Sequence, residues 1–282
     1  MQNFNYHQHT YRCKHADLDM QDEDYVRDYI KMGFKKIAFT DHCPEKNKID
    51  KREKMRMEYS ERHEYLDSIK NLKQKYADKI QIQSGYEVEY LPGEEENLKE
   101  LKSEVDKIIL GQHFVYDESN NLKIVRLSGD LNKFTDAELM RYAEYIVKAM
   151  KLGIPDTIAH PDFFMYASDS FGEVENKISD MICKVAEKYN IALEINLNDI
   201  FKKIYYENRE VNFLPVEEQR EKLKNVVYPC KEFWKIASNY NVKVLYGLDV
   251  HHKGQIELFK ELVQFANEII GSETISKLSF VE

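Results

Sequence analysis

Lys36-Ile37-Ala38-Phe39-Thr40-Asp41-His42 is the stretch that decides the fold. Branched and aromatic side chains, Ile37, Phe39 and Thr40, dominate its first five residues and favour a buried strand, and its last two place an acid and an imidazole at the strand's end. A helical pattern over residues 23–32 precedes it and stops at Gly33, a residue suited to a helix C-terminus. The sequence therefore predicts a helix followed by a strand that ends in polar, reactive side chains.

The same alternation recurs along the whole chain. The predicted strands are residues 4–7, 36–40, 80–88, 107–111, 157–160, 191–196 and 242–247. The predicted helices are residues 23–32, 136–152, 173–189 and 255–270, and the charged stretch 52–76 predicts one long helix or two shorter ones. Alternating strands and helices indicate a parallel sheet, because each return connection needs a crossover. Seven such units fit either a barrel with one unit fewer than the usual eight or an open doubly wound sheet.

Length and composition restrict the class of protein. The 282 residues are 43% hydrophobic, which excludes a disordered chain. No apolar run approaches the roughly 18–20 residues that span a bilayer. Glycine-rich nucleotide-binding motifs are absent from the sequence, which weakens the nucleotide-binding versions of the open sheet. We expect one domain over residues 1–282, with the long, polar and aperiodic stretch 199–219 as a lid or an insertion.

Charge and cysteine content predict a cytoplasmic protein. The chain has 41 basic and 50 acidic residues, so its net charge of −9 gives no general attraction to nucleic acid. Residues 1–7 show neither the basic start nor the apolar stretch of a signal peptide. The four cysteines are widely separated, which disfavours disulfides and a thiolate zinc site. Cys13 and Cys43 lie beside histidines and are either metal ligands or small buried side chains.

Histidine or acidic residues stand at or just after the ends of six of the seven predicted strands. In chain order they are His7 and His9, His42, Glu87, His113, His160, and Asp249 with His251. The carboxyl ends of parallel strands meet at one face of a barrel, so these side chains are expected to converge. A lone histidine at a strand end is more typical of a hydrogen-bonded structural residue than of a ligand. Their recurrence predicts a shared site for zinc, manganese or iron, in which a carboxylate bridges two ions.

Several motifs, taken in order, resemble those of the PHP (polymerase and histidinol phosphatase) superfamily. The opening ones are His7-x-His9, Cys13-x-His15-Ala16 and Thr40-Asp41-His42-x-Pro44. The later ones are Gly85-x-Glu87-Val88-Glu89-Tyr90, His113-Phe114, Ala159-His160-Pro161 and Gly247-x-Asp249-x-His251. The resemblance covers nearly the whole chain and is closest to the monofunctional histidinol-phosphate phosphatases.

The resemblance implies a distorted seven-stranded (β/α)7 TIM-like barrel with three divalent metal ions. His7, His9, Glu87 and Asp249 would hold the first ion, Glu87, His113 and His160 the second, and His15, His42 and His251 the third. Glu87 would bridge the first two ions, and Glu87, Asp249 and His251 would form the catalytic group. His15 enters this set through the resemblance alone.

The implied activity is metal-dependent hydrolysis of a small phosphomonoester, L-histidinol phosphate, in histidine biosynthesis. Bound ions would cancel the phosphate charge and supply hydroxide at neutral pH. Asp41 and Asp162 neighbour the expected ligands His42 and His160, and each either orients a ligand or serves as a turn residue. Glu89 shares a strand face with Glu87 and either supports a ligand or pairs with a lysine.

One departure from the family concerns the substrate phosphate. Related phosphatases follow a Glu-Ile-Asn stretch with an Arg-Lys pair, whereas this chain has Phe201 at the expected arginine position. Lys202 or Lys203 is expected to substitute, as a point charge and not as a bidentate fork. Arg12 is a further candidate, with a surface role as the alternative.

Three other functions remain open from the sequence. The first is a PHP-family phosphoesterase that acts on another small phosphomonoester or on nucleic acid. The second is a hydrolase of the amidohydrolase kind, which also has H-x-H on its first strand and an aspartate on its last. The third is a metal-binding module without catalysis. The sequence names neither the metal nor the oligomeric state.

Overall fold

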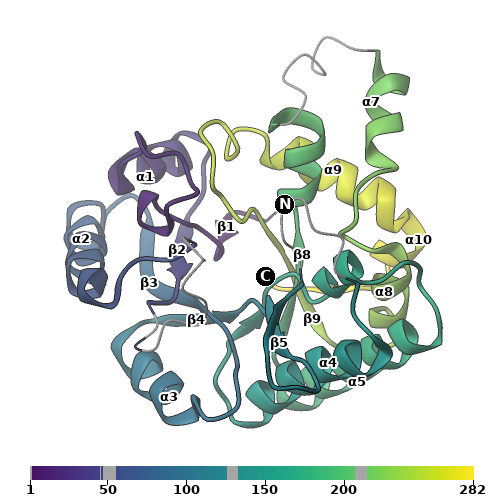
Figure 1. The fold of residues 1–282 in the computed structure, drawn as a ribbon. Helices are drawn as coiled ribbons and strands as arrows, with labels where there is room; N and C mark the ends of the chain where they lie inside the picture. Colours follow the sequence, from purple (N-terminus) through teal and green to yellow (C-terminus); the bar gives the residue numbers. More distant parts are fainter. Residues whose placement is uncertain (1, 45, 47–54, 126–132, 207–214) are drawn as a thin grey trace.

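A parallel sheet of eight strands curls through the centre of the molecule, with helices around its outside (Figure 1). The computed structural model describes residues 2–44, 46, 55–125, 133–206 and 215–282. The strands are β1 (Phe4–Asn5), β2 (Lys36–His42), β3 (Gln81–Val88), β4 (Lys107–Leu110), β7 (Thr157–Ile158), β8 (Ala192–Asn196), β9 (Lys243–Gly247) and β10 (Ser279–Phe280). They neighbour one another in chain order and every pair is parallel. A doubly wound sheet reverses its strand order, so this topology excludes it.

All seven predicted strands are present, but a sheet of seven strands was the wrong prediction. The eighth strand, β10, pairs with β9 through Ser279 opposite Lys243 and Phe280 opposite Val244. Two residues are too short to give a period-two pattern, so the sequence carries no sign of it. The architecture is therefore an α/β fold with a curled, parallel eight-stranded sheet.

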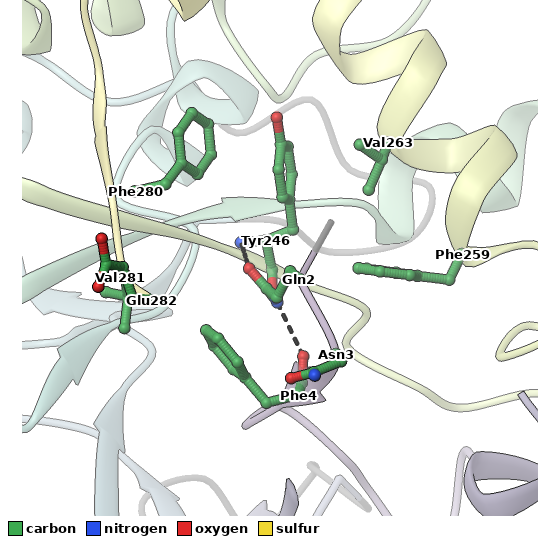
Figure 2. A pocket seen from close by; sticks show the side chains of 9 residues that line it. All are labelled: Gln2, Asn3, Phe4, Tyr246, Phe259, Val263, Phe280, Val281 and Glu282. Carbon is green, nitrogen blue, oxygen red and sulfur yellow. Dashed lines mark hydrogen bonds between the residues drawn. The ribbon is translucent and has the colours of Figure 1, made fainter. Parts of the chain in front are cut away.

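The segment that contains β1 contacts β9 in two places, which differ in kind. At the carboxyl ends, Gln8 and Val250 form a parallel bridge, and the amide of His9 donates to the carbonyl of Val250 at 3.1 Å. Ahead of β1, the side chain of Gln2 bonds the backbone of Tyr246 in β9 in both directions, at 2.7 and 3.0 Å. Beside Gln2 lies a largely apolar cavity of about 660 Å³, whose aromatic walls include Phe4, Tyr246 and Phe280 (Figure 2). The first strand therefore meets β9 through backbone pairing at the end where the histidines lie.

Helices follow the strands as predicted, with differences at their ends. They are α1 (Asp22–Lys31), α2 (Arg62–Lys75), α3 (Glu95–Glu104), α4 (Asp136–Lys151), α5 (Glu173–Tyr189), α6 (Asn198–Phe201), α7 (Val216–Leu223), α8 (Lys231–Ala237), α9 (Phe259–Ile270) and α10 (Ser272–Ile275). Thr135 caps α4 by accepting from the amide of Glu138, whose carboxylate accepts from the amide of Thr135. The prediction for residues 255–270 began too early, because α9 starts at Phe259 after turns.

Shorter elements complete the chain. They are the antiparallel hairpin β5 (Phe114–Tyr116) and β6 (Leu122–Ile124), the 3₁₀ turns η1 (Tyr11–Cys13), η2 (Tyr59–Glu61) and η3 (Phe163–Ala167), and the π-helical turn η4 (Lys202–Tyr206). The predicted helix over 52–76 is helical from η2 onward, and residues 52–54 lie outside the described residues. Within 199–219, residues 207–214 also lie outside them, so a lid or insertion there stays a prediction. Among the described helices, none has the length and apolar character needed to cross a bilayer.

Gly85 lets β3 pack closely between its neighbours, and we predict that Gly85→Ala destabilises the fold by about 1–3 kcal/mol. A Cβ on Gly85 would lie 2.6 Å from the carbonyl oxygen of Lys107 and 2.8 Å from Cγ2 of Thr40. The backbone carbonyl cannot move without disturbing the β3–β4 pairing. Urea unfolding would measure the loss, with the exposed Gln81→Ala on the same strand as control. Equal midpoints for the two variants would contradict this account.

Candidate metal centre

Glu87 lies at the middle of a buried cluster of imidazoles at the carboxyl ends of the strands. Its Oε1 is 3.0 Å from His160 Nε2, 3.6 Å from His7 Nε2 and 3.8 Å from His113 Nε2. Its Oε2 is 2.9 Å from His42 Nδ1 and 3.5 Å from His9 Nε2. Gly111, just after β4, leaves room for this carboxylate, because a Cβ there would overlap Oε1. The predicted convergence of strand ends is therefore present.

Asp249 brings a second carboxylate to the same cluster. Its Oδ1 is 3.1 Å from His9 Nε2, 3.2 Å from His251 Nδ1 and 3.3 Å from His7 Nε2. Asp249 has a backbone φ of 50° and His160 a φ of 29°, a left-handed region that non-glycine residues rarely occupy. Such strain persists where the surrounding structure holds the residue in place, and it often accompanies functional sites.

A third grouping forms beside these two. The Nε2 atoms of His15 and His251 are 2.8 Å apart, and the ring centroids of His15 and His42 are 5.3 Å apart. The ligand atoms of His15, His42 and His251 all lie within 4.8 Å of one another, as do those of His7, His9 and Glu87 and those of His42, Glu87 and His113. The nine predicted metal ligands therefore share one site, and His15, which only the resemblance suggested, is part of it.

The donor atoms in this cluster fit cations. The facing Nε2 atoms of His7 and His9 are 3.1 Å apart, and two unprotonated nitrogens at this distance repel unless a positive charge lies near them. Among the described residues, Oε2 of Glu87 and Oδ1 of Asp249 are buried and approached only by imidazole nitrogens, at 2.9 Å or more, with no hydrogen bond from a backbone amide or another side chain. Buried carboxylate oxygens without donors are costly, and a bound metal ion removes that cost. Imidazole and carboxylate donors together suit zinc, manganese or iron.

Hydrogen bonds hold the outward-facing ring nitrogens. His113 Nδ1 lies 2.7 Å from Glu89, His9 Nδ1 lies 3.4 Å from Asp41, and His15 Nδ1 lies 2.9 Å from the carbonyl oxygen of Cys13. These contacts leave the Nε2 atoms facing the cluster, which is the arrangement expected of histidine ligands. Asp41 therefore contacts His9 instead of the ring of its chain neighbour His42. Asp41 also accepts from the hydroxyl and amide of Thr10.

Asp162 takes a different place from the one its sequence position suggested. One of its oxygens accepts from the amide of Cys230 at 2.7 Å and from Trp234 Nε1 at 3.0 Å, and its other oxygen has no donor among the described residues. Nδ1 of His160 likewise has no partner in that part of the chain. Asp162 therefore ties the start of α8 to the loop after β7 and does not hydrogen-bond the His160 ring. Burial, as the main cause, raises the pKa of Asp162 to about 7.

The predicted substrate contacts divide into one residue at the cluster and two away from it. A cavity of about 130 Å³ opens over the cluster, and Lys202 lines it together with Asn198, Phe163 and Tyr228. Lys203 does not line this cavity. Arg12 does not reach it either, because its guanidinium is buried and ion-paired with Asp22 at 2.8 Å and Glu64 at 2.9 Å. The ion pairs of Arg12 therefore oppose the prediction that it contacts the phosphate.

Sequence reasoning missed a set of polar residues around β8. Glu194 lies 3.0 Å from His7 Nδ1, and the amides of Asn196 and Asn198 donate to Asp249 Oδ2 at 3.3 and 3.0 Å. All three are buried. The sign in the sequence was the alternation Glu194-Ile195-Asn196, which places two polar side chains on the same face of an otherwise apolar strand. Without known neighbours, that pattern looks the same as a salt-bridged strand.

The protonation states of the imidazoles differ across the cluster. Burial is the main cause that lowers the pKa of His15, His42 and His251, to about 3 for His251, so these rings are neutral at pH 7. Burial also lowers the pKa of His9, but Asp249 and Asp41 raise it by more, so that the pKa is about 9. Burial is likewise outweighed at His7, whose pKa Asp249, Glu194 and Glu87 raise well above its usual value. In the metal-free protein, His7 and His9 therefore hold protons that a metal ion must displace.

Comparisons with known proteins agree on one family. A family model described as "PHP domain" matches residues 5–198. The histidinol-phosphatase of Bacillus subtilis (strain 168) is 23% identical over 237 residues, which cover 75% of this chain and 88% of that protein. A probable histidinol-phosphatase of Schizosaccharomyces pombe is 32% identical over 111 residues, 36% of each chain.

Two solved structures share the fold. The putative histidinol phosphatase of Listeria monocytogenes superposes with a TM-score of 0.72 at 22% identity, covering 90% of this chain and 97% of its own. The histidinol phosphate phosphatase of Lactococcus lactis subsp. lactis, crystallised with zinc, L-histidinol and phosphate, superposes with a TM-score of 0.63 at 17% identity, covering 94% of each chain. At these identities the similarity establishes the fold.

Zinc binding should weaken as the pH falls, because His7 and His9 must lose protons before they can act as ligands. Between about pH 8.5 and about pH 6.5 we expect the apparent affinity to drop by at least about tenfold per pH unit, one proton's worth for His9 with a further contribution from His7. Competition with a chelating dye of known pH dependence measures this. An affinity that does not change over this range would show that neither ring carries a displaceable proton.

Proposed function

The chain belongs to the PHP domain family, and from that premise we propose that it is a metal-dependent phosphatase that hydrolyses L-histidinol phosphate to L-histidinol and phosphate. The observation that carries the proposal is the buried cluster in which Glu87 and Asp249 lie among seven imidazoles beneath a cavity. The names of the relatives support the substrate, since the Bacillus histidinol-phosphatase aligns over most of its own length.

We assign three divalent ions to the cluster. His7, His9, Glu87 and Asp249 would hold the first, Glu87, His113 and His160 the second, and His15, His42 and His251 the third. Glu87 Oε1 is 3.0 Å from Nε2 of His160, an assigned ligand of the second ion, and Oε2 is 3.5 Å from Nε2 of His9, an assigned ligand of the first, which supports a bridging role for this carboxylate. The relative from Lactococcus lactis was crystallised with zinc, which supports zinc as one of the ions.

Bound divalent ions supply neutralisation of the phosphate charge and a water whose pKa is lowered to about 7. The protein's own contribution begins with ionised ligands. Burial raises the pKa of Asp249, but His7 and His251 lower it further, to well below its usual value, so this carboxylate stays charged. The imidazoles act in the same way on Glu87. His251, neutral at pH 7, offers an unprotonated ring nitrogen at the cavity wall.

Lys202 is the cation placed to hold the phosphate. It lines the cavity together with the histidines, and its charge helps to lower the pKa of His15 and His251. Phe201, where the family pattern has arginine, is buried and stacks on His252 with 5.9 Å between ring centroids. The site therefore offers an ammonium, a point charge, in place of a planar fork, which places less demand on the orientation of the phosphate.

An aromatic part of the cavity lining suits the leaving group. Phe163 and Tyr228 line it, their ring centroids are 5.5 Å apart, and His160 packs against both. Aromatic faces bind flat heteroaromatic and cationic groups, and histidinol carries both an imidazole and an ammonium. This wall favours histidinol phosphate over an aliphatic phosphomonoester.

Phosphate release from L-histidinol phosphate by the zinc- or manganese-loaded protein tests the proposed activity. We expect turnover, and a loss of roughly a hundredfold or more in His160→Ala, because a ligand imidazole is removed. His63→Ala, which removes an exposed histidine of α2, is the matched control and should keep full activity. A panel with other phosphomonoesters, single-stranded DNA and an amide is run in parallel. No release from any phosphomonoester would refute the proposal, and faster cleavage of another substrate would refute its choice of histidinol phosphate.

The neighbouring lysines allow a second, finer test. Lys202→Ala should raise KM for the phosphoester by roughly ten- to hundredfold, the effect of losing one charge-assisted hydrogen bond. Lys203→Ala removes the same charge from the adjacent position, which does not line the cavity, and should leave KM nearly unchanged. Steady-state kinetics at saturating metal separate the two variants. Equal effects would assign the cationic role to general charge and not to Lys202.

A further inference from the structure

Strand β8 contributes no residue to the three proposed metal ligand sets, yet it ends in buried polar side chains that contact them. Glu194 is fully buried, with both carboxylate oxygens 3.0 Å from His7 Nδ1. Its Oε1 also accepts from the side-chain amide of Asn196 at 2.6 Å and from the backbone amide of His160 at 3.4 Å. A carboxylate surrounded by donors in this way has a fixed position.

We infer that Glu194 is a positioning residue for the metal centre. It holds the proton of His7 on Nδ1 and thereby leaves Nε2, which faces His9, Glu87 and Asp249, as the only nitrogen free to bind an ion. The inference rests on the proposed metal site and adds to it the group that selects the tautomer and the orientation of one ligand. In metalloproteins such partners raise the basicity of the ligand and the affinity for the metal.

The same network orients Asp249. Asn196 donates to Glu194 Oε1 and also lies 3.3 Å from Asp249 Oδ2, and Asn198 donates to that same oxygen at 3.0 Å. The side-chain oxygen of Asn196 accepts from the backbone amide of Asn198. This bond fixes the direction in which the side-chain NH2 group of Asn196 points. Oδ2 of Asp249 is therefore occupied, and Oδ1 is left toward the imidazoles. Glu194 and the two asparagines fix His7 and Asp249 relative to each other.

Gly247 at the end of β9 is part of this arrangement. A Cβ there would overlap the carboxylate of Glu194. The residue must therefore be glycine if Glu194 is to reach His7. Gly247→Ala thus offers a way to displace the carboxylate while its charge remains in the protein.

The test compares zinc affinity and the state of the His7 ring. Glu194→Gln keeps the shape but removes the charge, and should lower the apparent zinc affinity by about 10–100-fold, with Gly247→Ala lowering it as well. Glu175→Gln is the matched control, because it neutralises another buried carboxylate that caps α5 through Gly172 and Ser168. That control should bind zinc as the wild type does. Competition with a chelating dye gives the affinities, and circular dichroism checks the fold of each variant.

Imidazole nitrogen NMR of the zinc-loaded wild type gives a readout that needs no variant. We expect His7 to carry a slowly exchanging Nδ1 proton with zinc on Nε2. Zinc on Nδ1 of His7, or folded Glu194→Gln and Gly247→Ala proteins with zinc affinities within twofold of wild type, would overturn the inference. If the wild type binds no zinc at all, the proposed metal site itself fails, which separates the two outcomes.

Discussion

The structure depends on the burial of two carboxylates, Glu87 and Asp249, beneath the carboxyl ends of the strands. Each is nearly inaccessible to water, and in the described residues each has an oxygen that only imidazole nitrogens approach. Buried charges without compensation are strongly destabilising, and metal-free protein meets this cost only in part, by holding protons on His7 and His9. Metal binding and stability are therefore coupled, because an ion that binds only the folded chain at free concentration c stabilises it by RT ln(1 + c/Kd), which grows with the logarithm of the ion concentration.

The parallel sheet explains how residues from distant parts of the chain meet. Every strand points the same way, so its last residues arrive at one end of the sheet, and alternate residues of each strand face the centre. The carboxyl ends of the first strand and of β9 are joined by the Gln8–Val250 bridge, which brings His7 and His9 beside Asp249. Ahead of β1 there is no such backbone pairing. There the chain contacts β9 through the side chain of Gln2, and a cavity lies beside it.

Much of this was available from sequence, for a physical reason. Branched and aromatic residues indicate a buried strand, and the first polar side chains after them indicate its end. Strand positions and candidate ligands such as His42 and His160 could therefore be predicted together. β10 could not be, because two residues carry no period. Glu194 was missed because the alternation Glu194-Ile195-Asn196 looks the same as a salt-bridged strand until its neighbours are known. Its role follows from its distance to His7, a residue 187 positions away.

Arg12 shows that sequence position can also suggest a functional role that long-range contacts rule out. An arginine near candidate ligands resembles a phosphate contact, but its guanidinium is held by Asp22 of α1 and by Glu64, 52 residues away on α2. The chain around Arg12 carries Thr10, which bonds Asp41, and His15, which joins the third histidine grouping. The ion pairs therefore tie this loop to two helices. Most of the cluster is placed by strand geometry, which is regular. His15 lies beyond a strand end, in a loop whose position depends on charged contacts, and this explains why neither spacing nor periodicity predicted it.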